Sequence, residues 1–369
     1  MATPRVKNAG AVRSRATVIQ TPESTIDPVP APAEPLRILA LDGGPSALLV
    51  VLMLTDLEKL APGFLEKVDV IAGTSAGAIT GLMLSTKPNP AHMLPVAENF
   101  WLNEQNYYKN SAFGYLKALT GLGAVNDPQY VQQFLEQKGV LASRTLADLA
   151  KKVVVTTFEV NPVRQAPGMR GPLNWQPKVF HNLTTDAPDL DVLAVDAALS
   201  SSASPVTTPI HQGRVDGGLA ANNPAMLGLA QVLRSAVVRD RHDVVMLSIG
   251  GGRAHESLKV TDNSWGYVQW LLNPKNPLLL LNGFLTGSSE AIAFETAEIL
   301  DKQKFCRLDP FFTEPGLLPF VQASPKKQQE TAASAPTQLM LQSTAHWLRA
   351  SGWLPESEPA QPAQMAAGA

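Results

Sequence analysis

Short apolar runs alternate with longer stretches of helical hydrophobic spacing along most of this 369-residue chain. A run of about four to eight apolar residues indicates a buried strand, and apolar residues recurring about every three or four positions indicate a helix. The pattern predicts strands at residues 37–41, 68–72, 152–159, 178–182 and 243–249, and helices at residues 47–60, 191–200 and 288–300. This alternation indicates an α/β fold with a mostly parallel central sheet and helices on both faces.

The composition changes at both ends of the chain. Residues 1–35 are rich in Pro, Ala and Thr without apolar periodicity, and residues 356–369 have the same character. Such segments bury too little apolar surface to fold, so we predict two disordered tails around one domain at residues 36–355. Basic residues near the start are not followed by an apolar segment, and no run of roughly 18 apolar residues occurs, so neither a signal peptide nor a membrane-spanning helix is predicted.

Charge and cysteine content narrow the classes of function. The net charge is -2 and no basic stripe with interleaved aromatic residues occurs, which argues against a nucleic-acid partner. The single cysteine, Cys306, cannot form an intrachain disulfide and fits a reducing compartment. We therefore expect a cytoplasmic protein, either free or in peripheral contact with a membrane, with export by a route that needs no cleaved signal as the alternative.

The strongest chemical signal is the pentapeptide Gly-Thr-Ser-Ala-Gly at residues 73–77. It lies between the predicted strand 68–72 and a helical apolar segment at residues 78–84, which is the setting of a nucleophile elbow. In such a turn the central Ser75 takes a strained backbone conformation, and side chains at the two flanking glycine positions would collide with the strand or helix. The pattern therefore predicts a nucleophilic Ser75 at the positive end of a helix.

A serine hydroxyl needs a base that accepts its proton. No histidine stands in a sequence setting that marks it as this base. The six histidines are His92, His181, His211, His242, His255 and His346. Asp216, in the segment Val-Asp-Gly-Gly-Leu, is the better candidate because the glycines after it allow another backbone to approach its carboxylate. Taken alone, this segment favours a simple Asp-Gly turn.

Three motifs in this order resemble those of patatin-like phospholipases. That family shows Asp-Gly-Gly-Gly-x-Arg-Gly after a strand, then Gly-x-Ser-x-Gly, and later Asp-Gly-Gly. This chain has Asp-Gly-Gly at residues 42–44, the serine motif at 73–77 and Asp-Gly-Gly at 216–218. Family-like segments flank the third motif, Ala-Leu-Ser-Ser-Ser-Ala-Ser-Pro at residues 198–205 and Ala-Asn-Asn-Pro-Ala at 221–225.

The resemblance covers roughly residues 36–350 and implies a three-layer domain that hydrolyses lipid acyl esters, as a phospholipase A or a lysophospholipase does. It implies a dyad of Ser75 and Asp216 that needs no histidine, metal ion or other cofactor, with the N–H groups of Gly43 and Gly44 as the oxyanion hole. The implied partner is a phospholipid or another acyl lipid. Because the pKa of a free aspartate is about 4, a partly desolvated carboxylate is expected.

One segment departs from the family pattern. Pro45 and Ala47 stand where the family has its third glycine and its arginine, and Pro45 has no N–H to donate. Loss of one oxyanion donor slows a reaction by roughly 10²–10³-fold, so a catalytically weakened lipid-binding protein is one alternative. The other alternative is an esterase of the α/β-hydrolase type, with His242, His255 or His346 completing a Ser-His-Asp triad.

Large apolar residues interrupted by Asn and Pro fill residues 265–285. Core packing is one explanation, and an acyl-chain groove or a surface that contacts a lipid interface is the other. Replacing Leu279 and Leu280 with serine separates them, because only the second explanation predicts selective loss of bilayer hydrolysis.

Overall fold

The computed structural model describes residues 34–103, 124, 126–161, 174–205, 207–253, 264–271, 279–312 and 324–355. The elements within these ranges belong to one compact unit, Ala33–Ala369. The predicted tails lie outside the described residues except for positions 34 and 35. Part of the predicted apolar stretch, residues 272–278, also lies outside them.

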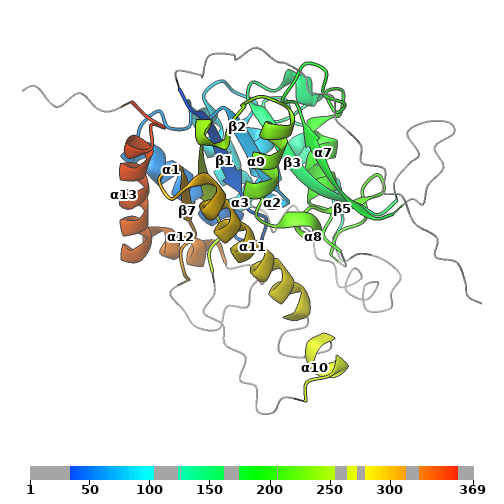
Figure 1. Ribbon diagram of the computed structural model, residues 1–369. Helices are drawn as coiled ribbons and strands as arrows, with labels where there is room; N and C mark the ends of the chain where they lie inside the picture. Colours follow the sequence, from blue (N-terminus) through cyan, green and yellow to red (C-terminus); the bar gives the residue numbers. More distant parts are fainter. Residues whose placement is uncertain are drawn as a thin grey trace, which may run out of the picture. The chain divides into compact units, whose positions relative to one another are not determined.

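Within the described residues, seven strands form one sheet (Figure 1). Six of them lie in the order β4-β3-β2-β1-β6-β7, and β5 pairs with β3. They are β1 (Leu36–Leu41), β2 (Val70–Thr74), β3 (Lys152–Glu159), β4 (Gln176–His181), β5 (Arg214–Asp216), β6 (Val244–Ile249) and β7 (Phe305–Leu308). Only β4 and β5 are antiparallel to their neighbour, so the mostly parallel sheet predicted from the sequence is confirmed.

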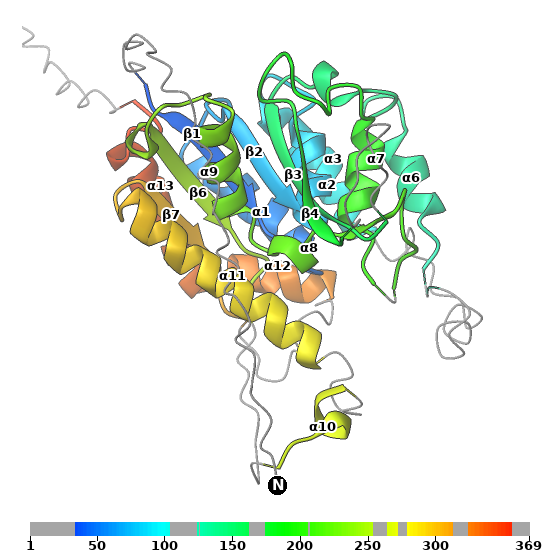
Figure 2. The ribbon, with the colours of Figure 1, turned by 45° about the vertical axis from the view of Figure 1, so that its right-hand side comes forward.

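Helices cover both faces of this sheet. On one face lie α1 (Ala47–Leu60), α2 (Ala76–Leu84), α3 (Leu94–Leu102), α6 (Gln129–Leu135), α7 (Ala194–Ser201), α12 (Pro325–Ala333) and α13 (Ala335–Ala350). On the other face lie α9 (Ala225–Arg234) and α11 (Leu279–Leu300), in front of the sheet in Figure 2. The short helices are α8 (Gly218–Ala221) and α10 (Tyr267–Leu271), with 3-10 turns at Pro90–Met93, Leu146–Asp148 and Arg241–Asp243.

Successive side chains of each central strand enter different cores. In β1, Leu39 and Leu41 belong to the larger core, whereas Ile38 and Ala40 belong to the core beneath α9 and α11. All four are fully buried. Because both faces are covered, the strand is a continuous apolar run instead of an alternating one. The predicted three-layer α/β fold is therefore confirmed.

The register of the sheet determines which loops meet. Thr74 at the end of β2 pairs with Thr156 of β3, and the next residue of β3, Thr157, lies opposite Asp216 of β5. β1 runs parallel to β2, so the turn after β1 lies at the same edge as the turn after β2. Ligand sites of parallel sheets lie at this carboxyl edge.

Candidate active site

Ser75 occupies a tight turn between β2 and α2. Its backbone has φ 53° and ψ −120°, a region that side-chain-bearing residues rarely adopt. A Cβ added at Gly73 would lie 2.7 Å from Ala78 Cα, and one added at Gly77 would overlap the backbone at the end of β1. The flanking glycines are therefore sterically required, and the turn presents the Ser75 side chain at the start of α2.

Ser75 and Asp216 meet although 141 positions separate them in the sequence. The Ser75 Oγ donates a hydrogen bond to Asp216 Oδ2 at 2.6 Å, and the N–H of Gly218 donates to Asp216 Oδ1 at 2.7 Å. Burial raises the pKa of Asp216 to about 6, against the opposing effect of these two hydrogen bonds. Such a carboxylate is a stronger base than a free aspartate and remains mostly ionised at neutral pH.

The turn after β1 lies against the elbow. A Cβ at Gly43 would come within 3.1 Å of Ser75 Cβ, so only glycine allows this approach. The Gly43 N–H donates to the carbonyl oxygen of Asn222 at 3.0 Å, so in this structure it already has an acceptor. Among the described residues, no hydrogen bond uses the N–H of Gly44 or of Ala76, the first residue of α2.

A largely buried ion pair fixes the start of the turn after β1. Arg307 of β7 donates to the two carboxylate oxygens of Asp42 at 2.8 and 2.6 Å, and to Asp309 Oδ2 at 3.0 Å. Burial alone would lower the pKa of Arg307, but the charges of Asp42 and Asp309 outweigh it and raise that pKa above its ordinary value. A bidentate pair of this kind fixes orientation as well as distance.

Two further residues fasten the elbow and the turn. The carbonyl of Asn222 accepts the Gly43 N–H, and the hydroxyl of Ser201 accepts the N–H of Ser75 at 2.8 Å. The same Ser201 hydroxyl donates to the Thr156 carbonyl at 2.6 Å. The sequence marks the segments that carry Asn222 and Ser201 as family-like but assigns neither residue a role. For Ser201, a run of three serines does not reveal which hydroxyl is used.

The histidines of the triad alternative lie away from the dyad or outside the described residues. His242 is exposed just before β6, at the amino edge of the parallel strands, whereas Ser75 follows the carboxyl end of β2. His346 is exposed on α13, and His255 is not described. Among the described residues, Asp216 is the hydrogen-bond partner of the Ser75 hydroxyl, and no histidine forms a hydrogen bond with that hydroxyl.

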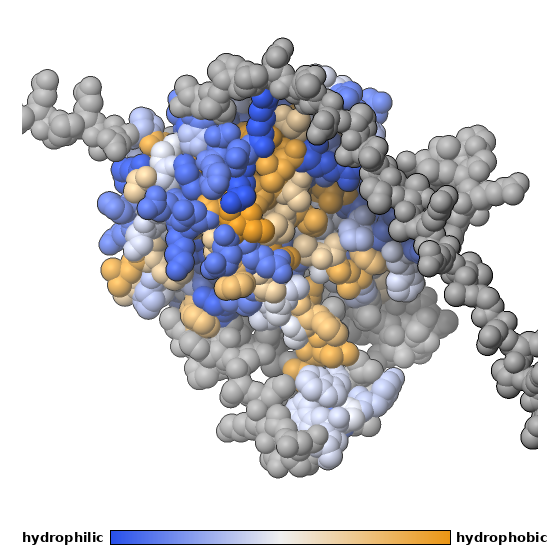
Figure 3. Space-filling view, viewed as in Figure 1, coloured by the Kyte–Doolittle hydropathy of each residue, from blue (hydrophilic) through white to orange (hydrophobic). Residues whose placement is uncertain are grey.

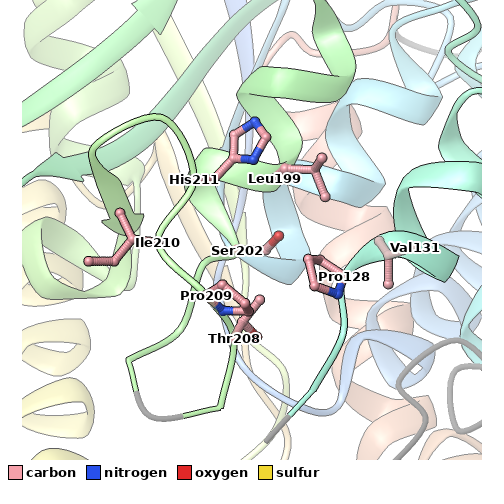
Figure 4. Close-up of a pocket in the computed structure, with 8 residues that line it drawn as sticks. All are labelled: Pro128, Val131, Leu199, Ser202, Thr208, Pro209, Ile210 and His211. Atoms are coloured by element: carbon pink, nitrogen blue, oxygen red, sulfur yellow. The ribbon is translucent and has the colours of Figure 1, made fainter. Parts of the chain in front are cut away.

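A small pocket opens beside the carboxyl end of α7 (Figure 4). Most of its lining is apolar, with Val131 from α6, Leu199 from α7 and Ile210 from the segment before β5. His211 also lines it and contacts Asp196 Oδ1 at 2.9 Å. Neither Ser75 nor Asp216 lines this pocket.

The surface near the dyad is partly apolar. The Leu285 side chain of α11 lies 3.1 Å from the position a Cβ would take at Gly218, two residues after Asp216. Apolar side chains gather at this amino end of α11, beside α10 (Figure 3). Phe284 is 68% exposed there, whereas Leu279 is buried. The predicted apolar stretch thus contains both core and exposed positions.

Metal-binding clusters and membrane-spanning helices are absent from the described ranges. No group of three or more His, Cys, Asp or Glu side chains within those ranges is arranged to hold a metal ion. No helix there has both the length and the apolar character needed to cross a bilayer.

Comparison with known proteins identifies the family. The patatin-like phospholipase family model matches residues 39–229, slightly more than half of the chain. Patatin-like protein 1 from Oryza sativa subsp. indica is 26% identical over 314 residues, covering 73% of this chain and 72% of that protein. Protein teg from Priestia megaterium is 29% identical over 318 residues, covering 77% of this chain and 92% of that protein. The cGAMP-activated phospholipase from Escherichia coli is 26% identical over 235 residues, covering 58% of this chain and 62% of that protein. The chain belongs to the patatin-like phospholipase family and so to a family of lipid acyl hydrolases.

Proposed function

We propose that this protein hydrolyses the acyl esters of phospholipids or lysophospholipids with Ser75 as nucleophile and Asp216 as base. The observation that carries the proposal is the 2.6 Å hydrogen bond that Ser75 Oγ, at a strained turn, donates to the buried carboxylate of Asp216. Family membership supports the general reaction class, and the geometry supports these two residues in these roles.

In the first half of the reaction, Ser75 Oγ attacks the ester carbonyl carbon while its proton passes to Asp216 Oδ2. The negative charge on the former carbonyl oxygen is stabilised by free N–H groups, for which we propose Gly44 and Ala76. The positive end of α2 favours the same charge. Collapse of this intermediate breaks the bond to the alcohol, which leaves with the proton from Asp216 and releases the lysolipid or glycerol compound.

In the second half, water hydrolyses the acyl group on Ser75. Asp216, ionised again, accepts a proton from the attacking water, and this proton returns to Ser75 Oγ as the fatty acid leaves. A base with a pKa of about 6 suits both halves because it accepts and releases a proton near neutral pH. Neither step requires a metal ion or an organic cofactor.

The lipid substrate would reach the dyad from a membrane or micelle surface. Exposed apolar side chains lie on α8, which directly follows the base in the chain, and on α11, which packs against α8, with Leu219 45% exposed and Phe284 68% exposed. Such side chains interact favourably with lipid when a peripheral protein rests on a bilayer. We therefore propose peripheral membrane contact through this side of the carboxyl edge.

A weakened lipid-binding protein is the second candidate, and one observation favours it. The Gly43 N–H is already engaged and Pro45 has none, so the turn offers fewer free donors than its glycines suggest. Labelling with a fluorophosphonate separates the candidates, because only an activated serine reacts. If folded protein is not labelled at Ser75 under conditions that label an active relative, the second candidate is supported.

A lipid-panel assay tests the proposal. Phosphatidylcholine vesicles, lysophosphatidylcholine micelles, triacylglycerol and a soluble p-nitrophenyl ester are offered to wild type, Ser75→Ala and Asp216→Ala. Asp186→Asn, at an exposed carboxylate, serves as the control. We expect fatty-acid release by wild type and the control and none above background by the two dyad variants. Activity that survives in Ser75→Ala contradicts the proposal.

A further inference from the structure

Ser201, at the end of α7, contacts both halves of the dyad. Its hydroxyl accepts the Ser75 N–H at 2.8 Å, and its carbonyl accepts the N–H of Gly217, next to Asp216, at 3.0 Å. The hydroxyl also donates to the Thr156 carbonyl at 2.6 Å. Ser201 is fully buried, so water does not replace these contacts.

The neighbouring Ser200 provides a natural comparison. It lies on the same helix and is equally buried. Its hydroxyl has no hydrogen-bond partner among the described residues. Two adjacent serines of the same burial therefore differ in what their hydroxyls bond: that of Ser201 joins the Ser75 N–H to the Thr156 carbonyl, and that of Ser200 bonds to no described residue.

We propose that Ser201 is a positioning residue that holds the Ser75 elbow at the distance from Asp216 that proton transfer requires, an inference that rests on the proposed hydrolase function. Ser75 is held in a strained backbone region that persists only when its surroundings enforce it. The Ser201 hydroxyl supplies this restraint because it ties the Ser75 N–H to Thr156 of β3. The Ser201 carbonyl accepts the N–H of Gly217 and so ties the segment that carries Asp216 to Ser201 as well.

Removal of the hydroxyl leaves the Ser75 N–H without its partner. The elbow then relaxes toward another partner or a less strained conformation, and the Oγ moves relative to Asp216. A displacement of about 1 Å in a reacting group can reduce the rate roughly 10²-fold. The dyad residues themselves stay chemically intact, so substrate binding is affected much less than turnover.

The test compares Ser201→Ala with Ser200→Ala. Hydrolysis of a soluble p-nitrophenyl ester gives kcat and KM, and the rate of fluorophosphonate labelling at Ser75 reports nucleophile reactivity without lipid. We expect kcat and the labelling rate of Ser201→Ala to fall about 10- to 100-fold, with KM changed less than about threefold. Ser200→Ala stays within about twofold of wild type, and Ser201→Thr, which keeps the hydroxyl, recovers much of the loss.

The pH profile adds a readout that a purely structural role does not change. The Ser75 hydrogen bond lowers the pKa of Asp216, so loosening it in Ser201→Ala moves the rise of the rate to higher pH. Ser200→Ala leaves the profile in place. Should Ser201→Ala fail to fold by circular dichroism, Ser201→Cys against Ser200→Cys carries the test, because a thiol fills the space but bonds weakly.

The outcomes separate this inference from the proposed function. Equal loss in the two alanine variants, or none in Ser201→Ala while wild type is active and Ser75→Ala inactive, overturns the positioning role alone. If folded wild type neither hydrolyses any ester nor labels at Ser75, the proposed function fails and this inference with it.

Discussion

Replacing Asp216 with asparagine should stabilise the fold while abolishing hydrolysis. The pKa of Asp216 rises from the ordinary 3.8 to about 6 because the carboxylate is buried, and the side chain faces no cationic partner among the causes of this shift. The difference is about 2 pH units, and one unit corresponds to about 1.4 kcal/mol, so the ionised carboxylate costs the folded state about 3 kcal/mol. Asparagine removes this cost and can still accept the Gly218 N–H.

The sign of the effect depends on pH. The folded protein binds the Asp216 proton more tightly than the unfolded chain, so this group makes wild type less stable as pH rises from about 4 to about 6. Above about pH 6 the full cost is present, and below about pH 4 it is absent. The advantage of Asp216→Asn is therefore expected at pH 8 and not at pH 3.5.

Urea unfolding of wild type, Asp216→Asn and the exposed control Asp186→Asn at about pH 8 and about pH 3.5 measures this advantage. We expect Asp216→Asn to exceed wild type by up to about 3 kcal/mol at the higher pH and to match it at the lower one. The control matches wild type at both. A variant that is less stable than wild type at pH 8, or equally advantaged at both pH values, would refute the reasoning.

Three other predictions follow from the same site. The pH dependence of kcat/KM for a soluble ester should show a loss of activity as pH falls below about 6, because protonated Asp216 cannot accept the Ser75 proton; a profile flat to pH 4.5 contradicts this. Arg307→Lys should lower kcat about tenfold with little change in KM, because lysine cannot hold Asp42 in the bidentate geometry; unchanged kcat argues against the anchor. Phe284→Ser should lower the hydrolysis of vesicle lipid severalfold and leave hydrolysis of the soluble ester unchanged, and equal loss on both substrates would contradict lipid contact. Leu279→Ser, at a buried position, should lower hydrolysis of both substrates because it destabilises the fold.

The central strands and the elbow are predictable because their constraints are local. A strand buried on both faces is an apolar run, and the steric demands of the elbow are met by glycines two positions from the serine. Helix α1 begins and ends where its hydrophobic spacing predicts, at Ala47–Leu60.

Elements that depend on tertiary contacts were not predictable in the same way. Helix α12 has little apolar character and buries polar side chains, including Gln328, whose Oε1 accepts the N–H of Leu49. Helix α11 begins at Leu279 instead of at the predicted residue 288. Glycines interrupt its first turns, but Leu285 packs next to Gly218 and α8 holds that half in place.

The residues of the site differ in the same way in how far the sequence predicts them. Motif order indicated Ser75 and Asp216, and the structure brings them together. The roles of Arg307 and Ser201 could not be predicted because each depends on which distant segments the sheet brings together. Asp42 and Arg307 are 265 positions apart, and Ser75 and Ser201 are 126 apart. A sequence shows that Gly43 has an N–H but not that Asn222 engages it.

Covalent labelling tests most directly whether a serine activated by a carboxylate carries out this chemistry without histidine. A fluorophosphonate is applied to folded wild type, to Asp216→Ala and to a variant in which His242, His255 and His346 are alanine, and the adduct is mapped by peptide mass spectrometry. We predict an adduct on Ser75 at similar rates in wild type and the histidine variant, and labelling at least about 100-fold slower in Asp216→Ala. Labelling that is lost with the histidines and retained without Asp216 would contradict the account.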